Sequence, residues 1–181
     1  MLIDNLPQDS ADAQEMRRWE EKYGDLLLTR FEEGHFTASG FILNPQRTHT
    51  LMIYHNIYQS WAWTGGHADG DHDFLAVALR EAREETGVEH IRPIDGTICS
   101  ADVIPVLAHS KHGQPVKAHV HLNVCYALEC AQEEPLRVKP DENSAVGWLP
   151  VDALKTYLSP EEQAQIYPIY QKILAKYSPR N

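Results

Sequence analysis

Three glutamates, Glu81, Glu84 and Glu85, lie close together in a stretch that the sequence predicts to be helical. Their i, i+3 and i+4 spacing places all three carboxylates on one side of a helix. Like charges at this spacing destabilise an isolated helix, and a bound divalent cation is a natural compensation. Ligation by carboxylates alone favours Mg²⁺ or Mn²⁺ over Zn²⁺. The stretch therefore predicts a metal site for a phosphate-bearing substrate.

A glycine-rich turn precedes this helix at a characteristic distance. Gly65 and Gly66 open the run Gly-Gly-His-Ala-Asp-Gly-Asp-His-Asp, and Arg80 and Gly87 follow Gly66 by fourteen and twenty-one positions. The spacing resembles the box of the Nudix hydrolase family, Gly-x5-Glu-x7-Arg-Glu-U-x-Glu-Glu-x-Gly-U, in which U is apolar. One position departs from the pattern, because His72 stands where the family has its first Glu.

The resemblance implies hydrolysis of the diphosphate bond in a nucleoside diphosphate linked to another moiety. By analogy with the family, the carboxylates of Glu81, Glu84 and Glu85 and the backbone carbonyl of Gly65 would hold Mg²⁺ or Mn²⁺. Such a site suits the chemistry, because the transition state of phosphoryl transfer spreads negative charge over several oxygens. A metal that bridges substrate oxygens can also activate the attacking water.

The role of Arg80 stays open at this point. In the family, the arginine at this position pairs with the first Glu of the box, which is His72 here. Asp71 or Asp73 could take over the pairing, or Arg80 could be free to contact phosphate. The same departure supports an alternative function, a Nudix-fold nucleotide-binding or regulatory module with weak or no turnover.

Glu142 is a further catalytic candidate outside the box. It lies in a loop before a predicted strand that contains Trp148. Many relatives bring another acid from such a loop to the metals, or use it as the general base. The alternative is an ordinary solvated loop acid.

Three histidines are candidates for substrate contact. His67 lies in the glycine turn, and His119 and His121 alternate along one face of a predicted strand, where imidazoles could contact phosphate or transfer protons. The alternative for the strand pair is a solvated or hydrogen-bonded face. No histidine pairs with a cysteine at a zinc-finger spacing, so the sequence predicts no zinc site. The histidines expected at the surface are His35, His109 and His112.

Apolar periodicity predicts an α/β chain with helices before, between and after mixed strands. The predicted helices cover residues 11–33, 74–86 and 160–177. The predicted strands cover 36–43, 50–55, 61–64, 97–109 and 116–128, with a strand running into a short helix over 147–154. This order predicts an α/β/α sandwich with a mixed sheet, the fold that the Nudix resemblance implies. Residues 1–181 are expected to form a single Nudix domain, divided into an N-terminal helical extension (1–35), the Nudix core (36–158) and a C-terminal helix (159–181).

Composition limits the partners of the chain. Its 181 residues carry a formal net charge of −10, which argues against nonspecific nucleic-acid binding but not against a small polyphosphate held by metal. No stretch approaches the roughly 20 apolar residues that span a membrane, and no secretory signal opens the chain, so a cytoplasmic protein is expected. The expected partner is a nucleotide or other small diphosphate, with a homodimer left open. Cys99, Cys125 and Cys130 are expected to be buried or idle thiols.

The particular substrate is not specified by these motifs. The extra motifs that separate subgroups of the family are mostly missing. A nucleotide sugar, a dinucleotide, a damaged nucleoside triphosphate and a non-nucleotide diphosphate all remain open.

Overall fold

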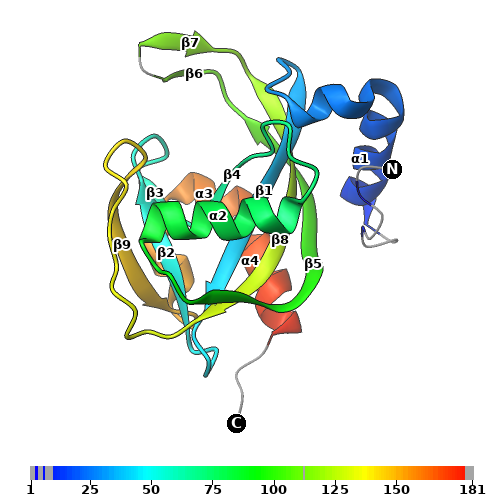
Figure 1. Ribbon diagram of the computed structural model, residues 1–181. Coiled ribbons are helices and arrows are strands. Elements are labelled where there is room, and N and C mark those ends of the chain that lie inside the picture. Colours follow the sequence, from blue (N-terminus) through cyan, green and yellow to red (C-terminus); the bar gives the residue numbers. More distant parts are fainter. Residues whose placement is uncertain (1–2, 4–5, 7–9, 112, 178–181) are drawn as a thin grey trace.

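The computed structural model describes residues 3, 6, 10–111 and 113–177, and its centre is a mixed β-sheet covered by helices (Figure 1). The strands of this sheet are β1 (Gly34–Leu43), β2 (His49–His55), β3 (Ser60–Ala62), β4 (Thr64–His67), β5 (Ile91–Val106), β8 (His119–Cys130) and β9 (Asn143–Pro150). The order is β3-β2-β1-β8-β5, with β4 paired to β1 and β9 paired to β2. A separate hairpin is formed by β6 (His109–Lys111) and β7 (Gln114–Val116).

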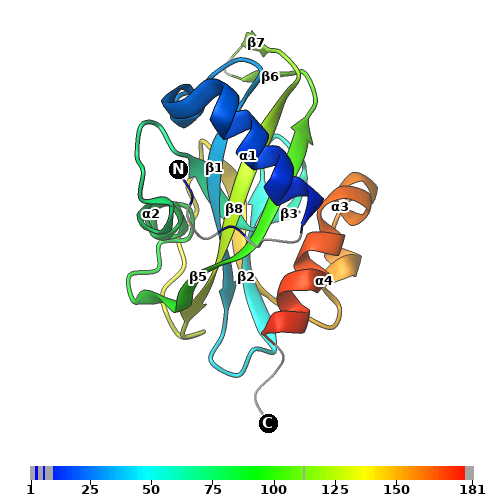
Figure 2. The same ribbon diagram turned by 90° about the vertical axis from the view of Figure 1, so that its right-hand side faces the viewer.

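Helices lie on both faces of the sheet, as Figure 2 shows. One face carries α2 (Phe74–Thr86), and the other carries α3 (Pro160–Gln165) and α4 (Tyr167–Lys176). An N-terminal helix, α1 (Ala11–Tyr23), packs against β5. All ten residues of β1 are buried, because this strand pairs in parallel with β8 and both of its faces are covered. The predicted α/β/α sandwich with a mixed sheet is confirmed.

Most predicted elements have close counterparts in the structure. The helix predicted over 74–86 is α2, and Gly87 ends it in the left-handed conformation at φ 78°. The strands predicted over 36–43 and 50–55 lie within β1 and β2. The strand predicted over 97–109 begins and ends earlier, as β5. This strand lies at an edge of the sheet, where Pro105 is tolerated.

One helix prediction was too long, one helix prediction merged two helices, and one strand prediction merged two strands. The helix predicted over 11–33 stops at Tyr23 and continues as a 3₁₀ turn, η1 (Gly24–Leu28). The helix predicted over 160–177 breaks at Ile166 into α3 and α4, because Pro168 has no backbone N–H and sits in the first turn of a new helix. The strand predicted over 61–64 is divided between β3 and β4.

All three cysteines, Cys99, Cys125 and Cys130, are buried free thiols, as predicted. None of the helices within the described residues has the length and apolar character needed to cross a bilayer.

Tyr170 fixes α4 to the sheet close to the glycine turn. Its side chain is fully buried, with ring centroids 5.3 Å from Phe41 and 5.2 Å from Trp63. Its hydroxyl oxygen also accepts a 3.1 Å hydrogen bond from the backbone N–H of Trp63. Trp63 is two residues before Gly65, so the C-terminal helix supports the strand segment that enters the turn.

We expect Tyr170→Phe to lower the free energy of unfolding by about 1–2 kcal/mol, because it removes the acceptor of the Trp63 N–H and keeps the packed ring. Urea denaturation followed by circular dichroism measures this change. Tyr157→Phe is the matched control, since Tyr157 is 40% exposed and should change the free energy by less than about 0.5 kcal/mol. Equal effects of the two substitutions would contradict this account of the contact.

Candidate functional site

The acidic helix α2 begins where the glycine-rich turn ends. The side chain of Asp73 caps the helix by accepting a 2.9 Å hydrogen bond from the N–H of Ala76. Asp71 in turn accepts a 2.9 Å hydrogen bond from the N–H of Asp73. The apolar side of α2 packs on β1 and β4, with Val77 and Ala78 fully buried. The cap and this packing fix the rotation of the helix, and therefore the direction of its glutamates.

Glu85 is the most deeply placed of the three glutamates. It is 3% exposed, and its Oε2 accepts a 2.9 Å hydrogen bond from the backbone N–H of Gly65. Burial raises the pKa of Glu85 to about 8; the hydrogen bond from Gly65 opposes this, and repulsion from Glu142 and Glu81 adds to it. The site therefore holds a buried carboxyl group next to other acids.

Glu81 lies directly against the other glycine of the turn. A Cβ added at Gly66 would overlap Cδ of Glu81, so a side chain at this position would displace the carboxylate. Burial raises the pKa of Glu81, and a 3.3 Å hydrogen bond from Arg80 opposes that shift. Gly66 thus allows β4 and α2 to approach until the acids of the helix reach the turn.

A lysine links the remaining two acids. The Nζ of Lys139 lies 3.2 Å from an oxygen of Glu84 and 3.0 Å from an oxygen of Glu142. Burial acts against the Lys139 ammonium, but hydrogen bonds to Glu142 and Glu84 outweigh it and raise the pKa of Lys139. Glu142 is therefore brought to the glutamates of α2, where it also acts electrostatically on Glu85.

Sequence reasoning missed Lys139. The i, i+3 spacing to Glu142 was visible in the sequence, but it does not by itself distinguish Lys139 from other lysines near an acid. Its contact with Glu84 depends on how the loop before β9 lies against α2.

Of the two acids that could pair with Arg80, the structure places Asp71 within ion-pair distance. Nη1 of Arg80 is 3.7 Å from an oxygen of Asp71, whereas Asp73 is used as the helix cap. The Arg80 side chain is 42% exposed, and it also reaches Glu81. His72, at the position of the missing Glu, is exposed.

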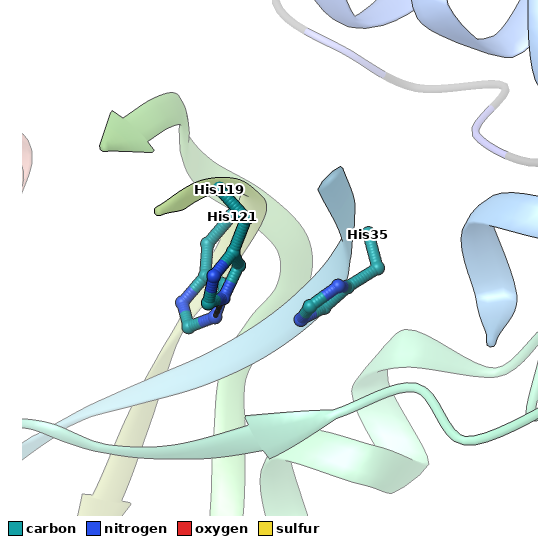
Figure 3. A group of neighbouring side chains, drawn as sticks. All are labelled: His35, His119 and His121. Carbon is teal, nitrogen blue, oxygen red and sulfur yellow. Dashed lines mark hydrogen bonds between the residues drawn. The ribbon is translucent and has the colours of Figure 1, made fainter. Parts of the chain in front are cut away.

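The three predicted histidines lie together, and a fourth one joins them. Ring centroids of His119 and His121 are 5.0 Å apart, and those of His67 and His121 are 5.3 Å apart. His35 lies 4.8 Å from His67 and 5.0 Å from His119 by the same measure. Figure 3 shows His35 turned toward the pair from β8.

The prediction that His35 lies at the surface was wrong, since it is 5% exposed. It is the second residue of β1, which pairs in parallel with β8 so that His35 is opposite His121. The antiparallel strand β4 brings His67 opposite Thr37. This grouping depends on the pairing of three strands and is not visible as a sequence spacing. His112 lies outside the described residues.

Comparison with known proteins agrees with this architecture. The MutT protein of Methanosarcina mazei Go1 is similar to this chain with a TM-score of 0.59 at 13% identity, over 81% of this chain and 97% of that one. An Ap4A hydrolase of C. elegans gives a TM-score of 0.54 at 15% identity, over 79% and 97%. The E. coli dihydroneopterin triphosphate pyrophosphohydrolase gives 0.52 at 15% identity, over 77% and 92%. At these identities the likeness shows the fold alone.

No curated protein matches the sequence significantly. The family model of the NUDIX domain, however, matches residues 34–173, which include the glycine turn, the acidic helix and the loop of Glu142. The chain therefore belongs to the Nudix family, the hydrolases of diphosphate bonds that its sequence resembles.

Proposed function

We propose that this chain is a metal-dependent pyrophosphohydrolase that cleaves the diphosphate bond of a nucleoside diphosphate linked to another moiety, with residues 1–181 acting as a single Nudix domain. The observation that carries the proposal is the buried carboxyl group of Glu85, held against the turn by Gly65 beside Glu81. Burying a carboxyl group beside other acids costs folding free energy, and a bound cation would offset that cost.

The residues present fit a hard divalent cation. The available donors are carboxylate oxygens, which Mg²⁺ and Mn²⁺ prefer, and Gly66 leaves the space that the Glu81 carboxylate occupies. Glu81, Glu84 and Glu85 would hold the metal, together with the carbonyl of Gly65. A metal held there would supply Lewis-acid stabilisation of the negative charge on the phosphate groups and would activate water for attack.

The other side chains of the site would deprotonate the attacking water and hold the acidic side chains in place. We assign Glu142 as the general base that accepts the proton of the attacking water. Lys139 positions it, because one ammonium group contacts both Glu142 and Glu84. Arg80 orients Glu81 and the turn through its contacts with Glu81 and Asp71.

Contacts to the substrate would come from the other side of the glycine turn. His67 directly follows Gly66, and His119 and His121 lie beside it on β8. We assign these three histidines to the region that receives the part of the substrate beyond the scissile bond.

Replacing two of the metal ligands tests the proposal most directly. We expect Glu84→Gln combined with Glu85→Gln to lower Mg²⁺- or Mn²⁺-dependent turnover by more than about 100-fold, because loss of direct ligands should exceed the effect of outer-shell changes. The measurement is release of phosphate-containing products from a panel of nucleoside diphosphate derivatives. Glu89→Gln, an exposed acid just beyond the helix, is the control.

Two outcomes of this panel would change the conclusion. Turnover that survives the double substitution would refute the metal assignment. A wild-type protein that binds nucleotides but hydrolyses none of them would favour the alternative, a Nudix-fold binding or regulatory module, for which His72 in place of the family Glu is the specific observation.

The metal-free protein should lose stability as pH rises. Burial raises the pKa of Glu85 in the folded state from 4.5 to about 8, so the folded state keeps a proton that the unfolded state releases. The contribution of Glu85 is therefore fully present below pH 4.5 and is lost as pH approaches about 8. Urea denaturation in a chelator should show wild type losing stability relative to Glu85→Gln across this range, and added Mn²⁺ should restore it. Parallel pH profiles of the two proteins would contradict this.

Restoring the family residue should have little effect. Since Asp71 already lies 3.7 Å from Arg80, we expect His72→Glu to change kcat/KM by less than about fivefold, the equivalent of about 1 kcal/mol for an exposed ion pair. Steady-state kinetics on the best substrate of the panel would measure it. A much larger gain would show that Asp71 does not replace the missing Glu.

A further inference from the structure

We propose that His35, His119 and His121 form a second metal site, separate from the acidic one, which binds a divalent transition metal of the Zn²⁺ class through three imidazole nitrogens. One ring nitrogen of each histidine lies within 4.8 Å of the others. Figure 3 shows the arrangement, with two rings from β8 and the ring of His35 facing them from β1. Both strands belong to the centre of the sheet, so the site stands on a rigid support.

The spacing of two of the donors already matches zinc ligation. The Nε2 atoms of His119 and His121 are 3.2 Å apart and share a hydrogen bond, whose proton a bound ion would replace. Two ligands at about 2.0–2.1 Å from zinc, placed at a tetrahedral angle, are separated by about 3.3 Å. The third nitrogen, from His35, lies up to 4.8 Å from the others and would have to move by roughly 1.5 Å to complete the same geometry.

Backbone carbonyls hold two of the rings in the tautomer that a metal requires. The Nδ1 of His35 lies 3.0 Å from the carbonyl oxygen of Phe31, and the Nδ1 of His119 lies 2.8 Å from that of Lys117. Because a carbonyl oxygen only accepts, each Nδ1 must carry hydrogen, and in the neutral ring Nε2 then presents its lone pair. A carbonyl that fixes the opposite ring nitrogen is the usual support of a metal-bound histidine.

The unused nitrogen of His35 points to a missing ligand. Its Nε2 is buried, and among the described residues it has no hydrogen-bond partner. A buried polar atom without a partner typically costs about 1–3 kcal/mol, and a metal ion would remove that cost. Burial also lowers the pKa of both His35 and His121, a direction that favours the neutral ring, which is the form that binds metal.

The chemistry of the donors separates this site from the acidic one. Imidazole nitrogens suit Zn²⁺, Co²⁺ and Ni²⁺, whereas carboxylate oxygens suit Mg²⁺ and Mn²⁺. Three histidines leave the fourth position of a tetrahedral ion for water, as in open zinc sites. His67 borders the cluster and directly follows Gly66, so such an ion would lie on the side of the glycine turn away from the glutamates.

Cobalt provides a direct probe that does not depend on turnover. We expect Co²⁺ added to the wild-type protein to give the visible absorption of a tetrahedral ion at one equivalent, and Zn²⁺ to displace it. His119→Ala and His121→Ala should abolish the band and weaken Zn²⁺ binding, measured by calorimetry, by about 100-fold or more.

Two controls locate the ion. His90→Ala removes an exposed histidine that pairs with Glu134, away from the cluster, and should retain the band. The double substitution Glu84→Gln and Glu85→Gln should also retain it, which distinguishes this site from the catalytic one. No band in the wild type, a band that survives both histidine substitutions, or a band lost with the glutamates would overturn the proposal.

A second measurement needs no variant. In crystals of the wild-type protein soaked with Zn²⁺, anomalous diffraction should place an ion about 2.0–2.1 Å from ring nitrogens of His35, His119 and His121. An ion found only beside the glutamates, or no ion at all, would refute the histidine site while leaving the proposed hydrolase untouched.

Discussion

The close approach of the glycine turn to α2 is the contact on which the rest of the site depends. The N–H of Gly65 holds the carboxyl group of Glu85 in a buried position, and Gly66 leaves the space in which Glu81 lies. In a low-dielectric setting, acids so close together raise one another's pKa unless a cation separates them. The same packing that stabilises the fold therefore concentrates negative charge, and Lys139 offsets part of it between Glu84 and Glu142.

The strand order explains why two chemically different groups lie beside one short turn. β4 pairs with β1, and β1 pairs in parallel with β8 along its whole length. Gly65 and Gly66 of β4 meet the acidic helix, whereas His67, the next residue, meets the histidines of the neighbouring strands. Consecutive residues of β4 thus face the carboxylate oxygens on one side and the imidazole nitrogens on the other. Each set of donors suits a different class of metal.

Much of this architecture could be predicted from the sequence, because its signals are local. The acidic helix has a regular apolar stripe, an aspartate cap and a glycine end, and its predicted limits match α2. The limits of α1 and α4 were missed, since a 3₁₀ turn and a proline interrupt otherwise helical patterns. Lys139 and His35 were missed for another reason. The contact of Lys139 with Glu84 and the contacts of His35 with the β8 histidines join residues far apart in the chain, and only loop placement and strand pairing bring them together.

The hydrogen bond between Trp63 and Tyr170 has a consequence for how the molecule can be handled. It joins the last helix of the described chain to the segment that enters the glycine turn. Any fusion, truncation or crystal contact that shifts α4 would be transmitted to the glycine turn through this hydrogen bond and through the packing of the Tyr170 ring on Trp63. Helix α4 thus stabilises the position of the glycine turn, although no residue of α4 belongs to the candidate site.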